Sequence, residues 1–356
     1  MKAFLRTELG SPILLAVALV LGACGTDGQD PPASAGLERA SSGDRSPYGE
    51  ARPFGYAGPV GETRTEGTGA PAEGDAELDP REPVHETEED WAILRETVEW
   101  ARGQSLHRLP VGEIMAMVGT TFVGTPYEPG TLELPGPEGL VVNLRALDCV
   151  TFVENLLAIG ILLRTMPEDL LESEEALRDR YREILTSIRY RGGELDGYSS
   201  RLHYFSEWIQ DNEGSGLVRD LTEELGGERD TRPIHFMSSN PDAYRQLTEV
   251  PAYRDAVEEL ERELAPRARY RIPEDRIESV EDEIQNGDII ATTSNVDGLD
   301  IAHTGIALRH QGRIHMIHAP LVGESVEITE LPLAERILRL GAQDGVMIAR
   351  PLEPGG

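Results

Sequence analysis

Apolar residues recur at intervals of three and four between residues 88 and 264, which is the spacing of one face of an α-helix. The stretch from 150 to 163 differs because it is apolar on nearly every side, and a helix without a polar face is typically buried. A later amphipathic stretch is interrupted by Pro251. The pattern predicts helices over residues 88–101, 114–122, 150–163, 168–188 and 242–264.

The pattern changes after residue 287, where short runs rich in β-branched residues replace the helical spacing. Gly, Asn and Asp, which favour turns, separate these runs. They predict strands over residues 288–293, 304–309, 313–319, 325–328 and 346–349. Because the helices come first and the strands last, we expect the α+β class with an antiparallel sheet.

The N-terminus carries a shorter apolar run without charge, from 13 to 21, preceded by Lys2 and Arg6. Even when it is counted from 12 to 23, the run is much shorter than the roughly 20 residues that cross a bilayer. Residues 1–23 are therefore predicted to be a secretory signal peptide.

The sequence Leu21-Gly22-Ala23-Cys24 resembles the lipobox of bacterial lipoproteins, in which the cysteine is lipidated and begins the mature chain. The resemblance implies export to the cell envelope and a lipid anchor at Cys24 in a bacterial membrane, on the periplasmic side. The outer membrane is one option, because Gly25 and Thr26 carry no acidic inner-membrane retention signal.

Composition separates a tether from the folded region. Residues 25–90 contain 11 Gly, 8 Pro, 16 acidic and 5 basic residues, so they cannot bury enough apolar surface to fold. We therefore expect a disordered acidic tether over residues 24–85. A single folded domain is expected over residues 86–356.

The formal net charge of −31 makes sequence-independent nucleic-acid binding unlikely as a function, because that binding needs a basic surface. The two cysteines, Cys24 and Cys149, are too few for a disulfide framework or a four-thiolate zinc site. No metal, cofactor or nucleic-acid partner is expected.

Cys149 immediately precedes the all-apolar helix. The helix dipole and the unbonded N–H groups of a first turn favour the thiolate, the form that acts as a nucleophile. Asp148 opposes this effect, because a neighbouring carboxylate raises the pKa of a thiol. The alternative is a buried structural cysteine, which is common in proteins.

The histidines favour the catalytic interpretation, because a cysteine nucleophile needs an imidazole base and a third group to orient it. His303 opens one predicted strand, and His315 and His318 lie on the next, so a hairpin can bring them together. Alternation puts His318 on the face of Ile314 and Met316, and His315 on the opposite face. It leaves open which face meets the helix. No tight ligand spacing supports a zinc site.

Several short motifs resemble the NlpC/p60 superfamily of papain-like cell-wall hydrolases, and more closely its N-acetylmuramoyl-L-alanine amidase-like family, domain of unknown function 1460. The resemblance covers roughly residues 86–352 and follows the superfamily order. The motifs are Gly124-Thr125-Pro126-Tyr127, Asp148-Cys149, Gly287-Asp288-Ile289-Ile290, His303-Thr304-Gly305-Ile306 and Ile317-His318-Ala319, together with the stretches 189–193, 197–204, 236–238 and 298–301.

The resemblance implies Cys149 as nucleophile, His303 as general base and His318 as the orienting third residue. It implies a papain-like fold, with the nucleophile at the start of a buried helix packed on the antiparallel sheet. The residues implied to bind substrate are Tyr127, Asp148, Tyr198, Arg201, His203 and Tyr204. For Arg201, His203 and Tyr204, packing within the region between the nucleophile and His303 is an equal alternative. That interval is long, so we expect a helical insertion over about residues 165–280 that walls one side of the groove.

The predicted function is a lipid-anchored cysteine amidase that acts on peptidoglycan or muropeptides. It would cleave the amide between the lactyl group of N-acetylmuramic acid and L-alanine through a thioester acyl-enzyme. The alternatives are a γ-D-glutamyl-diamino acid endopeptidase acting on the stem peptide, and a non-catalytic wall-binding module.

Overall fold

A computed structural model of the chain describes residues 83–167, 173–321 and 325–355. The predicted signal peptide, Cys24 and the predicted tether up to residue 82 lie outside the described residues. Val84 and His85, which the sequence assigned to the tether, form strand β1 (Val84–His85) and pair in parallel with β2 (Leu140–Val141).

The first three predicted helices begin within three residues of their predicted starts, whereas the helix predicted over residues 168–188 is described from Glu174 onward. Capping boxes start two of them: Thr87 with Asp90 at α2, and Asp148 with Thr151 at α4. Pro251 interrupts the stretch 242–264 as expected: one helix ends at Glu249, and Pro251 opens the next in its first turn, where a missing N–H costs nothing. The helices are α2 (Glu88–Gly103), α3 (Val111–Thr121), α4 (Cys149–Thr165), α6 (Glu174–Arg189), α7 (Phe205–Gly214), α8 (Phe236–Ser239), α9 (Arg245–Glu249), α10 (Pro251–Leu264), α11 (Ile277–Val280) and α12 (Leu333–Ile337).

An antiparallel sheet in the order β4-β5-β10-β6-β7-β8-β9 supports the second half of the chain, and β3 also pairs with β10. The five strands that the sequence predicts are all present in this sheet, and the ends of each lie within three residues of the predicted ends. The strands are β3 (Val218–Asp220), β4 (Glu228–Asp230), β5 (Arg269–Pro273), β6 (Ile289–Ser294), β7 (Ile301–His310), β8 (Arg313–His318), β9 (Glu327–Ile328) and β10 (Gln343–Pro351). The described chain is therefore a mixed α+β structure.

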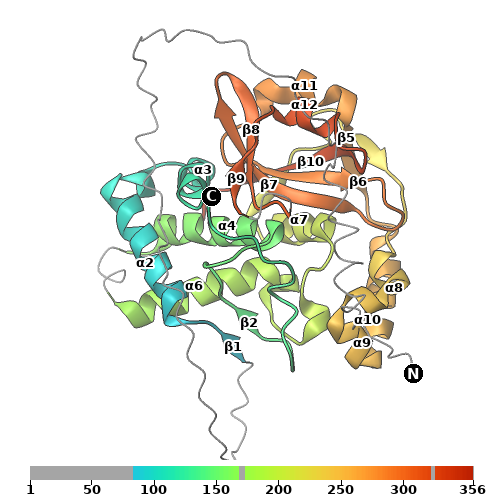
Figure 1. Cartoon of the computed structure of the whole chain (residues 1–356), viewed down its shortest axis with the longest axis horizontal. Helices are drawn as coiled ribbons and strands as arrows, with labels where there is room; N and C mark the ends of the chain where they lie inside the picture. The colour runs from blue at the N-terminus through green and yellow to red at the C-terminus, as the bar shows by residue number, and fades with distance from the viewer. Residues whose placement is uncertain (1–82, 168–172, 322–324, 356) are drawn as a thin grey trace, which may run out of the picture.

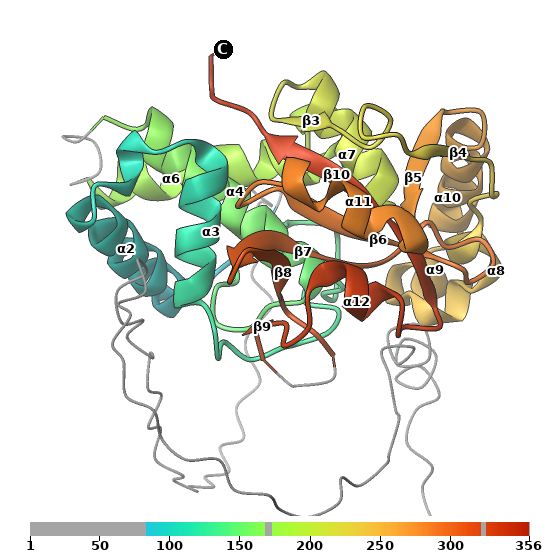
Figure 2. The ribbon, with the colours of Figure 1, turned by 90° about the horizontal axis from the view of Figure 1, so that it is seen from above.

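Helices cover both faces of this sheet (Figures 1 and 2). Alternation along β6 explains why, because Ile289 packs with α3 and α4 while Ile290 packs with α11 and α12. In Figure 1, α4 runs beneath the sheet with α6 below it, and α11 and α12 lie above. None of the helices in the described residues is long and apolar enough to span a membrane.

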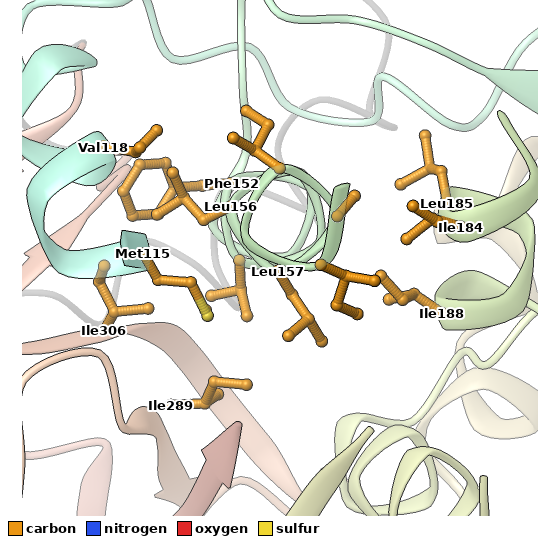
Figure 3. Close-up of a cluster of buried hydrophobic side chains, with 14 of the residues drawn as sticks. Met115, Val118, Phe152, Leu156, Leu157, Ile184, Leu185, Ile188, Ile289 and Ile306 are labelled. Carbon is orange, nitrogen blue, oxygen red and sulfur yellow. The ribbon is translucent and has the colours of Figure 1, made fainter. Parts of the chain in front are cut away.

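Helix α4 is the centre of the molecule, as its all-round apolar pattern predicts. Viewed along its axis, it is contacted by α3 on one side, α6 on another and the sheet on a third (Figure 3). The labelled side chains are Met115, Val118, Phe152, Leu156, Leu157, Ile184, Leu185, Ile188, Ile289 and Ile306. Burial on all sides holds the first residue of α4 in a fixed position relative to the sheet.

The segment from 165 to 280 is not purely helical. It supplies α6 to α11, but its strands β3, β4 and β5 join the sheet. Its α8, α9 and α10 form a third hydrophobic cluster with Tyr198 and Tyr204.

Candidate active site

Cys149 is the first residue of α4, and its side chain is almost buried, with 9% of the residue exposed. The preceding residue, Asp148, caps the helix: its carboxylate accepts hydrogen bonds from the backbone N–H and the hydroxyl of Thr151, both at 2.8 Å. The backbone carbonyl of Cys149 accepts a 2.7 Å hydrogen bond from the hydroxyl of Thr304 on β7. The thiol is thus held at the positive end of α4 and beside the sheet.

The structure brings His303 and His318 together across the β7–β8 hairpin. Nε2 of His303 lies 2.6 Å from Nδ1 of His318, and the rings meet edge to face. A bulge sits next to this pair, because Thr292 pairs with His303 and Thr293 with Ile301, which leaves Ala302 as an extra residue. Bulges of this kind redirect side chains beside active sites.

His315 lies elsewhere, with Nδ1 2.7 Å from the backbone oxygen of Thr329. The strand alternation explains the separation. His318 shares the face of Ile314 and Met316, which pack under α12, whereas His315 shares the opposite face with Ile317, which packs with α4. The structure therefore brings His318, and not His315, into contact with His303.

Both paired imidazoles are neutral at neutral pH. Burial lowers the pKa of His318 to about 3, with a further contribution from the positive charge of Arg336. Burial also holds the pKa of His303 well below its ordinary value, and His318 and Arg336 lower it further. Each ring therefore carries one N–H donor and one acceptor nitrogen.

A cavity of about 250 Å³ opens at this point of the molecule, and both Cys149 and His303 line it. Its wall is mostly apolar and comes from α4, β7, the loop before β7 and the segment 203–244. The lining residues are Cys149, Val150, His203, Tyr204, Phe205, Phe236, Met237, Ala243, Tyr244, Leu299, Asp300, Ile301, Ala302, His303 and Thr304.

Of the predicted substrate-binding residues, His203 and Tyr204 line the cavity. Nε2 of His203 lies 2.8 Å from the backbone oxygen of Tyr198, and burial, reinforced by the charge of Arg201, holds its pKa well below the ordinary value. The Tyr204 hydroxyl donates to Glu261 at 2.7 Å and accepts from the backbone N–H of Met237 at 2.9 Å. Both side chains are thereby fixed in the wall.

The other four predicted substrate-binding residues do not line this cavity. Asp148 caps α4, and the backbone of Tyr127 forms a bridge with Leu147, just before the cap. Tyr198 is fully buried between Tyr253, His203 and the guanidinium of Arg201.

Arg201 is buried with its own internal partners. Its guanidinium lies 2.5 Å from Glu133 and 3.5 Å from Glu138, and it donates to the carbonyl of Leu132 at 2.9 Å. Since these contacts occupy the guanidinium, the packing alternative describes Arg201 better than recognition of a substrate carboxylate.

Sequence reasoning missed most of the apolar wall, including Phe236, Tyr244 and Leu299. It also missed Asp300, whose carboxylate accepts from the backbone N–H groups of Ser206 at 2.8 Å and Ile301 at 2.7 Å. In the sequence, the stretches 236–238 and 298–301 stand out only as family motifs. They meet here because the N–H groups of His235 and Phe236 both donate to the carbonyl of Gly298.

A thiol at the head of a buried helix, with two hydrogen-bonded imidazoles on the adjacent sheet and one cavity touching both, has the components of a nucleophilic hydrolase site. Within the ranges that the structure describes, no group of three or more His, Cys, Asp or Glu residues could hold a metal ion.

Comparison with known proteins shows the family of this chain. The model of the AmiA-like family, N-acetylmuramoyl-L-alanine amidase-like, matches residues 117–340. An N-acetylmuramoyl-L-alanine amidase from Bacteroides uniformis is 33% identical with a TM-score of 0.63, covering 68% of this chain and 99% of its own. The chain therefore belongs to the N-acetylmuramoyl-L-alanine amidase-like family.

Two further solved structures are similar. A Bacteroides fragilis protein described provisionally as a xylanase is 34% identical with a TM-score of 0.60, over 65% of this chain and 98% of its own. A Legionella pneumophila protein of the DUF1460 family model shares the fold at 19% identity, with a TM-score of 0.52 over 74% of this chain and 95% of its own. No curated protein matches the sequence.

Proposed function

We propose that the chain is a cysteine-dependent amidase that hydrolyses the bond between the lactyl group of N-acetylmuramic acid and L-alanine. The family and the B. uniformis relative support an amidase acting on peptidoglycan or muropeptides. The observation that carries the cysteine mechanism is that Cys149 and His303 line one cavity while His303 is bonded to His318.

The proposed reaction begins with proton transfer from the thiol to His303. Nε2 of His303 is engaged by His318, so Nδ1 is the nitrogen left to take the proton. The thiolate attacks the lactyl carbonyl, the C–N bond breaks, and the imidazolium protonates the leaving amine of L-alanine. Water, deprotonated by the same ring, then hydrolyses the thioester and releases the muramyl carboxylate and the thiol.

The position of Cys149 at the start of α4 stabilises negative charge both when the thiolate forms and when it attacks the carbonyl. The first-turn N–H groups and the dipole of α4 favour the thiolate and also the oxyanion that forms on the attacked carbonyl. A thiolate opposite His303 would raise the pKa of that ring from its low resting value, because an adjacent negative charge favours the imidazolium. Nucleophile and base thereby stabilise each other's charged form.

The name of the B. fragilis relative suggests glycoside hydrolysis. The residues that line the cavity favour a thiol reaction instead. Most glycosidases need two carboxyl groups that flank the scissile bond. Asp300 is the one carboxylate among the residues that line this cavity, and both its oxygens accept backbone hydrogen bonds.

The wider context of the proposal comes from the sequence. We infer a papain-like NlpC/p60 fold, because a nucleophile-bearing helix against an antiparallel sheet with histidines on adjacent strands matches that arrangement. We also infer export and lipidation at Cys24, with the enzyme held in the cell envelope by its anchor. The lipobox-like Leu21-Gly22-Ala23-Cys24 supports this inference.

The test is digestion of purified muropeptides with analysis of the products by mass spectrometry. The proposal expects free N-acetylmuramic acid-containing sugar and an intact stem peptide beginning with L-alanine. Release of L-Ala-D-Glu would reassign the chain as an endopeptidase, and absence of any product would leave a wall-binding module.

Cys149→Ala should lower the turnover of muropeptides at least a thousandfold, since removal of a nucleophile abolishes the covalent route. The matched control is His310→Ala, which removes an exposed histidine of the same hairpin and should leave turnover unchanged. Activity that survived in Cys149→Ala would show that the mechanism is wrong.

A further inference from the structure

One buried nitrogen in the site has no hydrogen bond among the described residues. Nε2 of His318 is inaccessible to solvent and lies 3.4 Å from Oε1 of Glu327, close but not aligned as a hydrogen bond. His318 itself is 0% exposed. A buried imidazole nitrogen without a hydrogen bond lowers the stability of the fold, so its nearest polar neighbour is the first candidate for a partner.

Strand pairing places Glu327 beside His318. The two residues are direct partners in the β8–β9 ladder, so their side chains leave the sheet next to each other. The Glu327 side chain is 44% exposed, and it can rotate to align its carboxylate with Nε2. Within the described residues, β9 is the last strand of the sheet, so no further strand pairs with it on the side away from β8.

The chain of ring nitrogens imposes a choice of tautomer. If His303 is to accept the thiol proton on Nδ1, its own proton must be on Nε2, where it donates to Nδ1 of His318. Nδ1 of His318 is then an acceptor, so the proton of His318 must be on Nε2, which faces Glu327. In the opposite arrangement His318 donates, His303 carries its proton on Nδ1, and it cannot act as a base.

We propose that Glu327 is a positioning residue of this site: its carboxylate accepts the Nε2 proton of His318 and so holds both imidazoles in the tautomers that leave Nδ1 of His303 basic. The proposal rests on the proposed cysteine mechanism. It adds a fourth member to the line from Cys149 through His303 and His318, supplied by an edge strand of two residues.

The other charged groups around the pair act against unwanted protonation. Arg336 of α12 lowers the pKa of both rings and also acts to lower that of Glu327, although burial raises the pKa of Glu327 overall. Arg336 thus disfavours imidazolium at rest, and Glu327 supplies the acceptor that the neutral rings need. Among the described residues, Arg336 and Glu327 are thus the charged side chains that act on the pair, and Cys149 lines the same cavity as His303.

A direct test reads the tautomers by long-range ¹H–¹⁵N correlation NMR on the full chain labelled at histidine nitrogens. The wild type should show His303 and His318 each protonated on Nε2 at pH 7.5. Glu327→Ala should move a detectable share of both rings to the Nδ1-protonated form. Glu327→Gln, which keeps an acceptor oxygen, should restore the Nε2 form.

The matched control is Glu330→Ala, which removes an exposed carboxylate just beyond the same strand. It should leave both tautomers unchanged. Unchanged tautomers in Glu327→Ala would overturn the proposal. If Glu327→Ala does not fold, Glu327→Met, which keeps the length of the side chain, gives the same test with the same two outcomes.

A second measurement needs no substrate and so separates this proposal from the proposed function. The rate at which iodoacetamide alkylates Cys149, followed by mass spectrometry of its peptide across pH, reports thiolate formation. Loss of the Glu327 charge should move the midpoint upward by roughly half to one pH unit and slow alkylation at pH 7 about three- to tenfold. A profile identical to wild type would contradict the role of Glu327, whichever bond the enzyme cleaves.

Discussion

At the scale of single residues, one buried hydroxyl links Cys149 to the sheet. Thr304 follows His303 directly in β7, and its Oγ1 donates to the carbonyl of Cys149 at 2.7 Å. This bond joins the helix that carries the thiol to the strand that carries the imidazole. It therefore fixes the spacing on which proton transfer depends.

Thr304→Val keeps the shape of the side chain but leaves the buried carbonyl without this partner. We expect about a tenfold lower kcat with little change in KM, and a loss of about 1–2 kcal/mol in the free energy of unfolding. Thr304→Ser, which retains the hydroxyl, should recover most of kcat. Steady-state kinetics and urea unfolding of the two variants check this, and a Ser variant as slow as the Val variant would contradict it.

Gly305 is a second positioning feature at this scale, and here the absence of a side chain matters. A Cβ on Gly305 would lie 2.7 Å from the backbone oxygen of Ile317 and 2.9 Å from Cβ of His318. Both contacts are closer than packed atoms allow, and neither partner is the end of a flexible chain. The glycine of the His303-Thr304-Gly305 motif therefore makes room for His318.

Gly305→Ala should push the β7 and β8 backbones apart and move His318 away from His303. We expect a loss of about 1–3 kcal/mol in stability, the usual cost of overpacking, and a fall in kcat larger than the stability loss explains. Gly341→Ala, where a Cβ meets nothing within 4 Å, is the control and should be silent in both. Thermal melts and kinetics measure the two effects, and a stable, fully active Gly305→Ala would refute the close-packing argument.

At the scale of elements, the wall of the cavity is held by contacts between α7, α8 and α10. Glu261 of α10 is buried and accepts from the Tyr204 hydroxyl at 2.7 Å and from the backbone N–H of Ser238 at 3.0 Å. Tyr204 in turn accepts from the backbone N–H of Met237. One carboxylate thus fixes Tyr204 directly, and it holds α8, whose Met237 also lines the cavity, through Ser238 and Tyr204.

Glu261→Gln keeps the size but exchanges an acceptor for a mixed donor and acceptor, whereas Glu261→Ala removes both bonds. We expect Glu261→Ala to raise KM for the muropeptide about three- to tenfold through a loosened wall, with kcat reduced less, and Glu261→Gln to lie between it and wild type. Glu258→Ala on an exposed face of the same helix is the control. An unchanged KM in Glu261→Ala would mean that this wall does not contact the substrate.

The element scale is also where sequence reasoning succeeded and failed. Periodicity located the ends of α2, α3 and α4 to within about three residues. Each of these helices buries apolar side chains against its neighbours, and this burial produces the apolar spacing that the sequence shows. It also placed Cys149 at the start of α4 and His303 and His318 on adjacent strands. These inferences needed only local pattern and the reach of a hairpin.

Features that depend on distant partners could not be inferred. For Arg201 the sequence leaves substrate binding and packing as equal alternatives, because its partners Glu133 and Glu138 lie more than 60 residues away in a segment without periodicity. The extra residue Ala302 gives no signal in alternation, since a bulge is recognised only against its partner strand. The strand that carries Glu327 is predicted, but its pairing with His318 depends on the register between β8 and β9, which no local pattern gives.

At the scale of the whole molecule, burial of neutral histidines links stability to pH. The folded-state pKa values of His303 and His318 lie below the ordinary value of 6.5, so the unfolded chain binds these protons more readily than the folded chain does. The stability that the two rings contribute is therefore complete above about pH 6.5 and is lost as the pH falls below it. His203 acts in the same direction, because burial and Arg201 lower its pKa as well.

Carboxyl groups with raised pKa values act in the opposite sense. Burial raises the pKa of Glu138 and Glu154, so the folded chain binds their protons more readily than the unfolded chain does. Their contribution favours the folded state as the pH falls toward the carboxyl range. Between pH 7.5 and 5.5 the histidines should dominate, because their unfolded-state titration is centred in that window.

We therefore expect the free energy of unfolding in urea to fall by about 4 kcal/mol between pH 7.5 and 5.5, at roughly 1.4 kcal/mol per pH unit for each of the three rings once the pH is below 6.5. His303 and His318 together should account for about two thirds of this fall. The double variant His303→Asn/His318→Asn should lose most of this slope and keep the part that His203 contributes. His310→Asn, which removes an exposed ring, should keep the wild-type slope. An equal slope in the wild type and the double variant would show that other groups, and not the paired imidazoles, set the acid limit of the fold.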